Sequence, residues 1–213
     1  MSTEYKLADR EDSHLIKVKE ANSDIVIGAP HHAPKEVTRL PCKDHPDSDE
    51  NAGYLAKYLA EKLDASLIIA VNAEEDYNKN PGSDYIEFIK DINPKILLEI
   101  HGHGGRKAKK DIEISTGSKK NEKWSIGLSK LLKESFQNED KLNKLSISGK
   151  WDEIYFTAKG TKSIKAGDWI GLHIELPSRL RLSNSNDSTL PPEEGYIFCD
   201  HLAEAVERLQ DYK

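Results

Sequence analysis

Two histidines and an acidic residue, at separate points of the chain, have the side chains from which zinc sites are built. They are His31, Glu50 and His101. A catalytic zinc site usually has three protein ligands drawn from His and Asp/Glu, with a fourth position for water or substrate. Zinc makes water acidic enough to attack near neutral pH if a carboxylate takes the proton and returns it to the leaving group. Glu175 is our candidate for that general base, so these residues together predict a zinc-dependent hydrolase.

Further polar residues could bind a substrate beside such a metal ion. Amide hydrolysis places negative charge on the carbonyl oxygen, which a cation next to the metal would stabilise. A second cation would bind an acidic substrate tail. The residues that we expect to bind substrate are Asn78, Lys79, His103, Lys159 and Arg179.

The choice among neighbouring histidines stays open at this stage. Either member of the pair His31-His32 could point toward the metal. His103 could be the ligand in place of His101, or it could lie behind the ligands and orient substrate or water. Asn78 and Lys79 could equally be turn residues, because a proline and a glycine follow them.

The acidic residues also have alternatives. Asp47 or Asp49 could supply the metal ligand, in which case Glu50 would only favour the start of a helix. Glu175 has apolar neighbours on both sides, so its side chain points the opposite way from theirs in a strand, toward either solvent or a cleft. We favour Glu50 as the ligand and the cleft for Glu175.

Short apolar runs alternate with helical patterns along the chain, which is typical of βα units around a largely parallel sheet. We therefore expect a three-layer α/β/α sandwich with a mostly parallel mixed sheet, a phosphorylase/hydrolase-like fold. Open α/β sheets bind ligands outside the carboxyl ends of their strands, where most of the candidate residues fall. The expected strands are 24–29, 66–71, 96–100, 111–115, 153–158 and 171–176; the expected helices lie near 52–63, 85–92, 122–136 and 193–209.

Length and composition favour one globular domain. The 213 residues suit a single domain, 1–213, with 1–20 expected as a peripheral extension. With 32% charged residues and a formal net charge of −6, the chain lacks the basic footprint of a nucleic-acid-binding protein. We expect the lysine-rich segments 106–110 and 119–123 to be solvated loops.

The chain also lacks signals for export or for a membrane. Its first 20 residues carry charges throughout, and no apolar run approaches the ~18 residues of a membrane helix. Cys42 and Cys199 are far apart and form no disulfide framework or four-cysteine zinc module. A cytoplasmic protein is the expectation; the oligomeric state is left open.

Five motifs in this order resemble those of the N-formylglutamate amidohydrolases, relatives of zinc carboxypeptidases and aspartoacylases. The resemblance spans most of the chain, and aligning the ends of the first helix places that family's acidic ligand on Glu50. The motifs are Pro30-His31, Asp49-Glu50 with the helix end Glu61–Ser66, Asp76-Tyr-Asn-Lys79, Glu99-Ile-His-Gly102 and Ile174-Glu-Leu176.

The resemblance implies a zinc-dependent hydrolase of an amide, with a small acidic N-acyl amino acid or a peptide-like molecule as substrate. Lys79 stands where that family has an arginine, which removes bidentate recognition of a carboxylate. The resemblance therefore implies metal-dependent hydrolysis more strongly than N-formylglutamate itself as the substrate.

Two other functions fit the same residues. One is a zinc peptidase or deacylase of a larger substrate, with the segment 151–168 as the wall that sets substrate length. The other is a binding module that kept the fold and lost the chemistry. Serine and nucleotide mechanisms are disfavoured, because the chain has no G-x-S-x-G elbow, H-E-x-x-H helix or P-loop.

Overall fold

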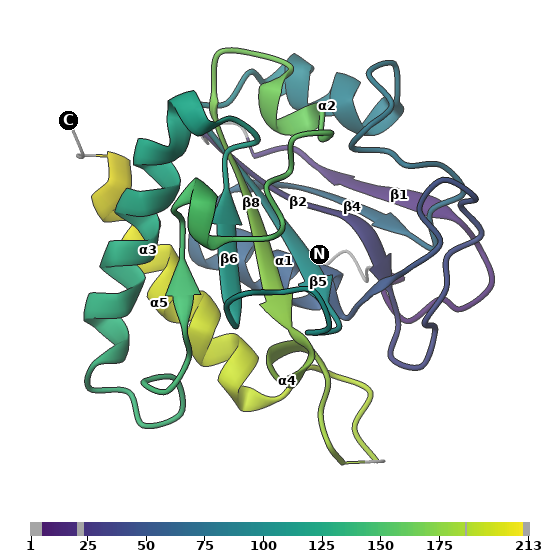
Figure 1. The fold of residues 1–213 in the computed structure, drawn as a ribbon. Helices are drawn as coiled ribbons and strands as arrows, with labels where there is room; N and C mark the ends of the chain where they lie inside the picture. The colour runs from purple at the N-terminus through teal and green to yellow at the C-terminus, as the bar shows by residue number, and fades with distance from the viewer. Residues whose placement is uncertain (1–5, 21–23, 186, 211–213) are drawn as a thin grey trace.

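The computed structural model describes residues 6–20, 24–185 and 187–210. Their centre is an eight-stranded sheet with the order β1-β4-β2-β5-β8-β6-β7 and with β3 beside β2 (Figure 1). Neighbouring strands are parallel except in the pairs β1–β4 and β6–β8, which confirms the mostly parallel mixed sheet. The strands are β1 (His14–Val18), β2 (Ile25–Ala33), β3 (Asp49–Glu50), β4 (Ser66–Val71), β5 (Ile96–His103), β6 (Ile112–Ser115), β7 (Ile147–Ser148) and β8 (Ile170–Pro177).

Helices cover the two faces of the sheet unequally. The long helices α1 (Ala52–Lys62), α3 (Glu122–Phe136) and α5 (Glu193–Gln210) pack on one face and share its apolar core. On the other face lie α2 (Asp84–Ile92) and the 3₁₀ helix η3 (Ser163–Lys165), over a smaller apolar cluster. Short helices complete the chain, namely η1 (Lys119–Asn121), η2 (Trp151–Glu153) and α4 (Ser178–Arg181). The three-layer fold is therefore confirmed.

The alternation of side chains in the central strands explains where polar groups gather. In β5, Ile96, Leu98 and Ile100 point into the core beneath the three long helices. The intervening residues Glu99 and His101 must then face the other side, because successive strand residues point in opposite directions. The same alternation in β8 turns His173 and Glu175 toward that side. The thinly covered face thus receives the polar groups.

One expectation about the elements was wrong. The segment 153–158 forms η2 and a loop rather than a strand. Its backbone N–H groups at Tyr155 and Phe156 donate to the carboxylate of Glu113, so they do not join the sheet. In the N-terminal segment that we expected to be peripheral, residues 14–18 form β1, an edge strand antiparallel to β4.

No helix among the described residues has both the length and the apolar character that crossing a membrane would require.

Candidate metal centre

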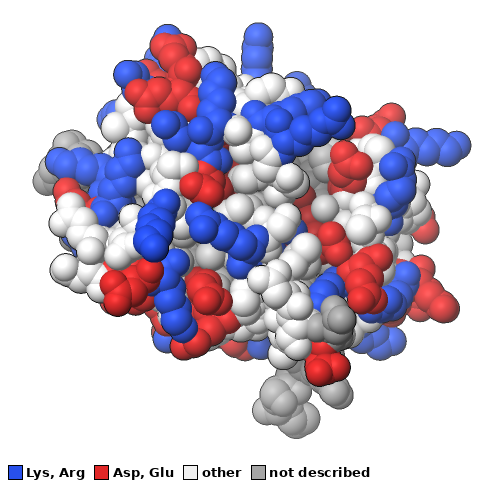
Figure 2. All heavy atoms as spheres, turned by 60° about the horizontal axis from the view of Figure 1, so that its bottom comes forward, with Lys and Arg blue, Asp and Glu red and all other residues white. Residues whose placement is uncertain are grey.

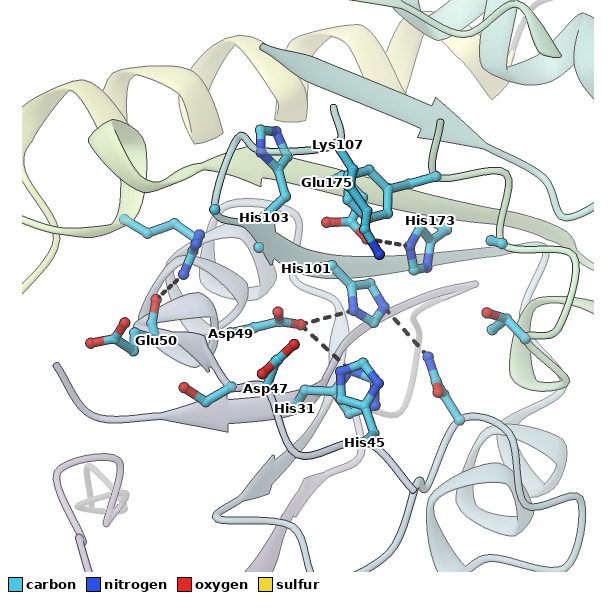
Figure 3. A pocket seen from close by; sticks show the side chains of 18 of the residues that line it. His31, His45, Asp47, Asp49, Glu50, His101, His103, Lys107, His173 and Glu175 are labelled. Carbon is cyan, nitrogen blue, oxygen red and sulfur yellow. Dashed lines mark hydrogen bonds and ion pairs between the residues drawn. The ribbon is translucent and has the colours of Figure 1, made fainter. Parts of the chain in front are cut away.

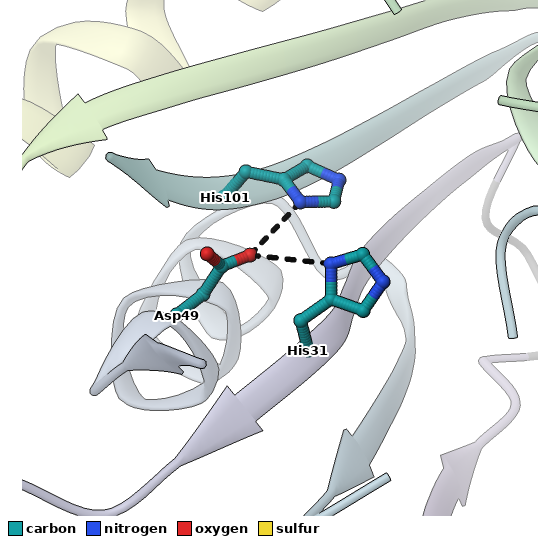
Figure 4. Close-up of side chains that lie close together, drawn as sticks. All are labelled: His31, Asp49 and His101. Carbon is teal, nitrogen blue, oxygen red and sulfur yellow. Dashed lines mark hydrogen bonds and ion pairs between the residues drawn. The ribbon is translucent and has the colours of Figure 1, made fainter. Parts of the chain in front are cut away.

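His31, Asp49 and His101 converge at the carboxyl ends of β2, β3 and β5 (Figure 4). One carboxylate oxygen, Asp49 Oδ2, lies 2.9 Å from Nδ1 of His101 and 3.5 Å from Nδ1 of His31. All three side chains are buried. Burial acts to raise the pKa of Asp49, but the contacts with His101 and His31 outweigh it, so the pKa lies below its ordinary value. The carboxylate is therefore charged and faces two imidazole nitrogens.

This donor set fits a zinc ion. Ligand bonds of about 2.0–2.2 Å in a tetrahedron place donor atoms roughly 3.3 Å apart, close to both distances from Asp49. His31 Nδ1 is buried and has no hydrogen-bond partner among the described residues, as expected for an atom that is free to bind a metal. Two other possible groups, His31/His45/Asp76 and Glu99/His101/His173, each share one histidine with this set. We take the set with Asp49 as the centre because it joins both histidines.

The acidic member of the set is Asp49, whereas the sequence had favoured Glu50. The two residues form β3, which pairs with the end of β2, so their side chains point in opposite directions. Asp49 points toward the histidines, while the Glu50 carboxylate accepts a 2.7 Å hydrogen bond from the backbone N–H of Glu36 and lies apart from His101 (Figure 3). Aligning the ends of helices could not locate a two-residue strand, which is why it favoured Glu50 over the neighbour that faces the histidines.

The structure also separates the two adjacent histidines. The register between β2 and β4 shifts between Ala29 and His32, where the strand carries an irregularity. His32 points away from the cluster, packs its ring edge-on against Tyr54, and donates from Nε2 to the backbone oxygen of Leu7. Burial lowers the pKa of His32 to about 4, so its ring is neutral. Of the pair, only His31 faces Asp49.

Polar groups behind the cluster orient both rings. His31 Nε2 lies 3.1 Å from Oδ1 of Asp76, and His101 Nε2 lies 3.5 Å from the side-chain amide of Asn78 and 3.7 Å from Glu99. When a histidine binds zinc through one nitrogen, the other commonly donates to a carboxylate or carbonyl, which fixes the tautomer; Asp76 and Glu99 are the carboxylates in these positions. Each ring thus presents Nδ1 to the centre and Nε2 to a polar partner behind it.

Glu175 faces the same region from β8. Its Cα is the register partner of His101 across the β5–β8 pair. Its Oε1 accepts a 2.9 Å hydrogen bond from Nε2 of His173, whose ring lies 3.9 Å from the His101 ring between centroids. Burial raises the pKa of Glu175 to about 7, a value suited to a general base near neutral pH.

A cavity of about 800 Å³ opens over these residues. Four of the five expected substrate-binding residues line it, namely Asn78, Lys79, His103 and Lys159. The ring of His103 uses both nitrogens, donating to the backbone oxygen of Asp111 and accepting from the N–H of Gly105, so neither is left for a metal. The Lys79 ammonium forms a 2.7 Å ion pair with Asp76 beside His31.

Arg179, the fifth expected residue, points elsewhere. Its guanidinium pairs with Asp111 at 3.0 Å, and it is not among the residues that line the cavity. Arg181 lines the cavity instead, with its buried guanidinium donating to the backbone oxygens of Glu50 and Leu176. Gly102 makes room for it, because a Cβ there would lie 2.1 Å from Arg181 Cζ. The short helix α4 begins just before Arg179 and turns Arg181, two residues on, inward.

Several residues of the site were missed in the sequence. His173 could have been found, since it lies two residues before Glu175 in a strand and must share its face. Arg106 and Lys107 line the cavity, although the segment 106–110 had been expected to be a solvated loop. His45 stacks on His31 with 3.8 Å between ring centroids, a long-range contact with no local signal.

No protein-family model matches this chain, and no curated protein is similar to it in sequence. Solved structures do share its fold. A bacteriophage poly-gamma-glutamate hydrolase has a TM-score of 0.60 and 12% identity, covering 94% of this chain and 91% of its own. An N-formylglutamate amidohydrolase from Ralstonia eutropha JMP134 has a TM-score of 0.52 and 11% identity, and the match covers 94% of this chain and 97% of that one. A structure described as YNDL-apo (Zinc-free) has a TM-score of 0.53 and 14% identity, and the match covers 96% of this chain and 92% of that one. The resemblance read from the sequence is thereby supported at the level of the fold.

Proposed function

We propose that this protein is a zinc-dependent amidohydrolase that cleaves an amide bond in an acidic N-acyl amino acid or peptide-like substrate. The observation that carries the proposal is the buried convergence of His31, Asp49 and His101, with Glu175 on the neighbouring strand. Buried polar side chains normally satisfy one another, whereas His31 Nδ1 and Glu175 Oε2 have no hydrogen-bond partner in the described part of the chain. Buried atoms that make no hydrogen bond suit a site that receives a metal and a substrate.

The residues of the site would have separate roles in hydrolysis. His31, Asp49 and His101 would hold the zinc ion, which when bound polarises the substrate carbonyl and lowers the pKa of water. Glu175 takes a proton from the attacking water and delivers it to the leaving nitrogen. His173 holds the Glu175 carboxylate in place through the hydrogen bond to Oε1, leaving Oε2 for the proton.

Positive charges around the cavity support an acidic substrate. Figure 2 shows Lys and Arg side chains, interspersed with Asp and Glu, around a central area of uncharged residues. The Lys and Arg residues that line the cavity, besides the buried Arg181, are Lys79, Arg106, Lys107 and Lys159. Two proteins with this fold are named for glutamate compounds, one for poly-gamma-glutamate and one for N-formylglutamate. These names and the charges agree on a substrate that carries carboxylates.

Zinc content tests the metal centre without knowledge of the substrate. Protein purified without added metal should contain near-stoichiometric zinc, which Asp49→Ala and His31→Ala should lose. Glu50→Ala is the matched control, because its carboxylate only accepts from the Glu36 backbone, and it should keep zinc. Zinc lost in Glu50→Ala but kept in Asp49→Ala would reverse the assignment, and absence of any transition metal in the parent protein would overturn the proposal.

The size of the cavity favours a second candidate, cleavage within a larger acidic chain. About 800 Å³ lies in the upper part of the ~300–1,000 Å³ range of pockets for drug-sized ligands, so it has room for several linked residues. Hydrolysis of poly-γ-L-glutamate and of N-formyl-L-glutamate by the same zinc-loaded protein separates the two candidates. A higher kcat/KM on the polymer supports the second, and the reverse supports the first.

A further inference from the structure

Glu113 is a buried carboxylate whose role the metal centre does not explain. It lies on β6, is fully shielded from solvent, and accepts hydrogen bonds from four backbone N–H groups. Oε1 accepts from Lys109 and Lys110 at 2.6 and 3.2 Å, and Oε2 accepts from Tyr155 and Phe156, both at 2.7 Å. One side chain therefore joins two loops that are far apart in the sequence.

Glu113 and Glu175 are neighbours with different environments. They are register partners across the antiparallel β6–β8 pair, so their side chains emerge from the same face of the sheet. A carboxylate can accept about four hydrogen bonds, and Glu113 has all four from the backbone. Glu175, in contrast, has a hydrogen bond on Oε1 only. The acceptor sites of Glu113 are therefore occupied by backbone N–H groups, whereas Oε2 of Glu175 remains available for proton transfer.

The two loops that Glu113 joins form one wall of the cavity. The loop between β5 and β6 contributes Arg106 and Lys107, and the loop after η2 contributes Phe156 and Lys159. Further contacts add to the junction, among them a 3.4 Å hydrogen bond from Lys109 Nζ to the backbone oxygen of Asp152. The ammonium of Lys107 lies 5.8 Å from the centroid of the Tyr155 ring, and the Phe156 ring stacks on His103 with 5.7 Å between centroids.

We propose that Glu113 is a positioning residue that sets substrate selectivity, by holding both loops so that Arg106, Lys107 and Lys159 face the acidic part of the substrate. Hydrogen bonds to an ionised carboxylate are shorter and stronger than neutral ones, which suits a single group that fixes two loops. A glutamine could not replace it, because its amide nitrogen would meet two N–H donors and leave both unpaired. This inference rests on the proposed function for the identity of the reaction.

The test compares zinc-loaded Glu113→Gln with the parent protein in four measurements. Hydrogen exchange should become faster at Lys109, Lys110, Tyr155 and Phe156. KM for the better of poly-γ-L-glutamate and N-formyl-L-glutamate should rise about tenfold with kcat little changed, since binding is lost rather than chemistry. Binding of poly-γ-L-glutamate, followed by calorimetry, should weaken by a similar factor, and zinc content should be unchanged.

Glu122→Gln is the matched control, since that carboxylate accepts only one backbone N–H, from Trp151, and does not line the cavity. It should leave all four measurements unchanged. If Glu113→Gln does not fold, Glu113→Asp keeps the charge but shortens the side chain, and the same changes are expected in it.

Two results would overturn the inference. One is a folded, zinc-loaded variant at Glu113 with the parent's exchange rates and KM. The other is a parent protein that does not bind poly-γ-L-glutamate, because the cationic wall would then have no acidic ligand. Failure of the proposed function looks different: the parent would bind the polymer but hydrolyse neither probe, while exchange and binding would still respond to Glu113→Gln.

Discussion

The metal centre and the cationic wall of the cavity are held in different ways. His101 and Glu175 lie on β5 and β8, whose backbones pair continuously in the middle of the sheet, and His31 lies on β2 next to the irregularity in its pairing with β4. The wall consists of loop residues 104–110 and 154–162, which hydrogen bonds to Glu113 join to each other. Groups on strands are positioned more precisely than groups on loops.

The difference separates chemistry from selectivity. The strands place the groups that would act on any amide, whereas the loops place the charges that would favour one substrate over another. Loops tolerate substitution and insertion better than the elements they connect, so selectivity could change here without loss of the metal centre. Changes in the centre should therefore abolish activity or zinc binding, and changes in the wall should alter KM.

Glu175→Gln should give the largest effect on turnover. Glutamine has nearly the same shape but cannot accept the proton, so kcat should fall about 10²–10⁴-fold while zinc content and KM change little. Steady-state kinetics on the better of the two glutamate substrates, with zinc measured in the same samples, checks this. Unchanged kcat would show that Glu175 is not the base and would favour a different proton acceptor.

The side-chain placements that the sequence predicted correctly follow from short-range patterns. The alternation around Ile174 and Leu176 turned Glu175 away from the core, and the strand ends placed His31 and His101 at one edge of the sheet. These arguments depend only on the period of a strand and on parallel pairing. The three-layer fold was predictable for the same reason.

The parts that the sequence missed depend on contacts between distant segments. Asp49 replaces Glu50 because a two-residue strand pairs with the end of β2, which no periodicity shows. The segment 153–158 has an apolar content that resembles a strand, but Glu113, some forty positions earlier, captures its backbone N–H groups. Arg181 points inward because α4 turns the chain and Gly102 leaves space.

Asp76→Asn should have the next largest effect, on zinc affinity. Asp76 accepts from Nε2 of His31, and loss of such a partner behind a ligand typically costs 10–100-fold in metal affinity. Competition with a zinc chelator measures the change. Glu75→Gln is the control: that neighbouring carboxylate is only partly buried and accepts from Asn80 rather than from a histidine, so zinc affinity should be unchanged. Equal affinity in the two variants would mean that Asp76 does not orient His31.

Substitutions at Gly102 and Gly104 compare a strand position with a loop position only two residues away. Gly102 belongs to β5, and an added Cβ would lie 2.1 Å from Cζ of the buried Arg181; Gly104 lies just beyond the strand, and a Cβ there meets no atom within 4 Å. Neither residue has a positive φ, so alanine is compatible with both backbones. Gly102→Ala should therefore destabilise by about 1–3 kcal/mol through overpacking, because the Arg181 guanidinium is anchored to backbone oxygens and cannot move freely.

Gly104→Ala should stay within about 0.5 kcal/mol of the parent protein, as surface substitutions usually do. Urea denaturation of both variants at one fixed zinc concentration measures the difference, since zinc bound to the folded state adds to apparent stability. Equal midpoints would show that Arg181 can withdraw from Gly102 at little cost, so that this end of β5 would be as adaptable as the loop that follows it. A large gap would place the boundary between the rigid centre and the adaptable wall within the segment from Gly102 to Gly104.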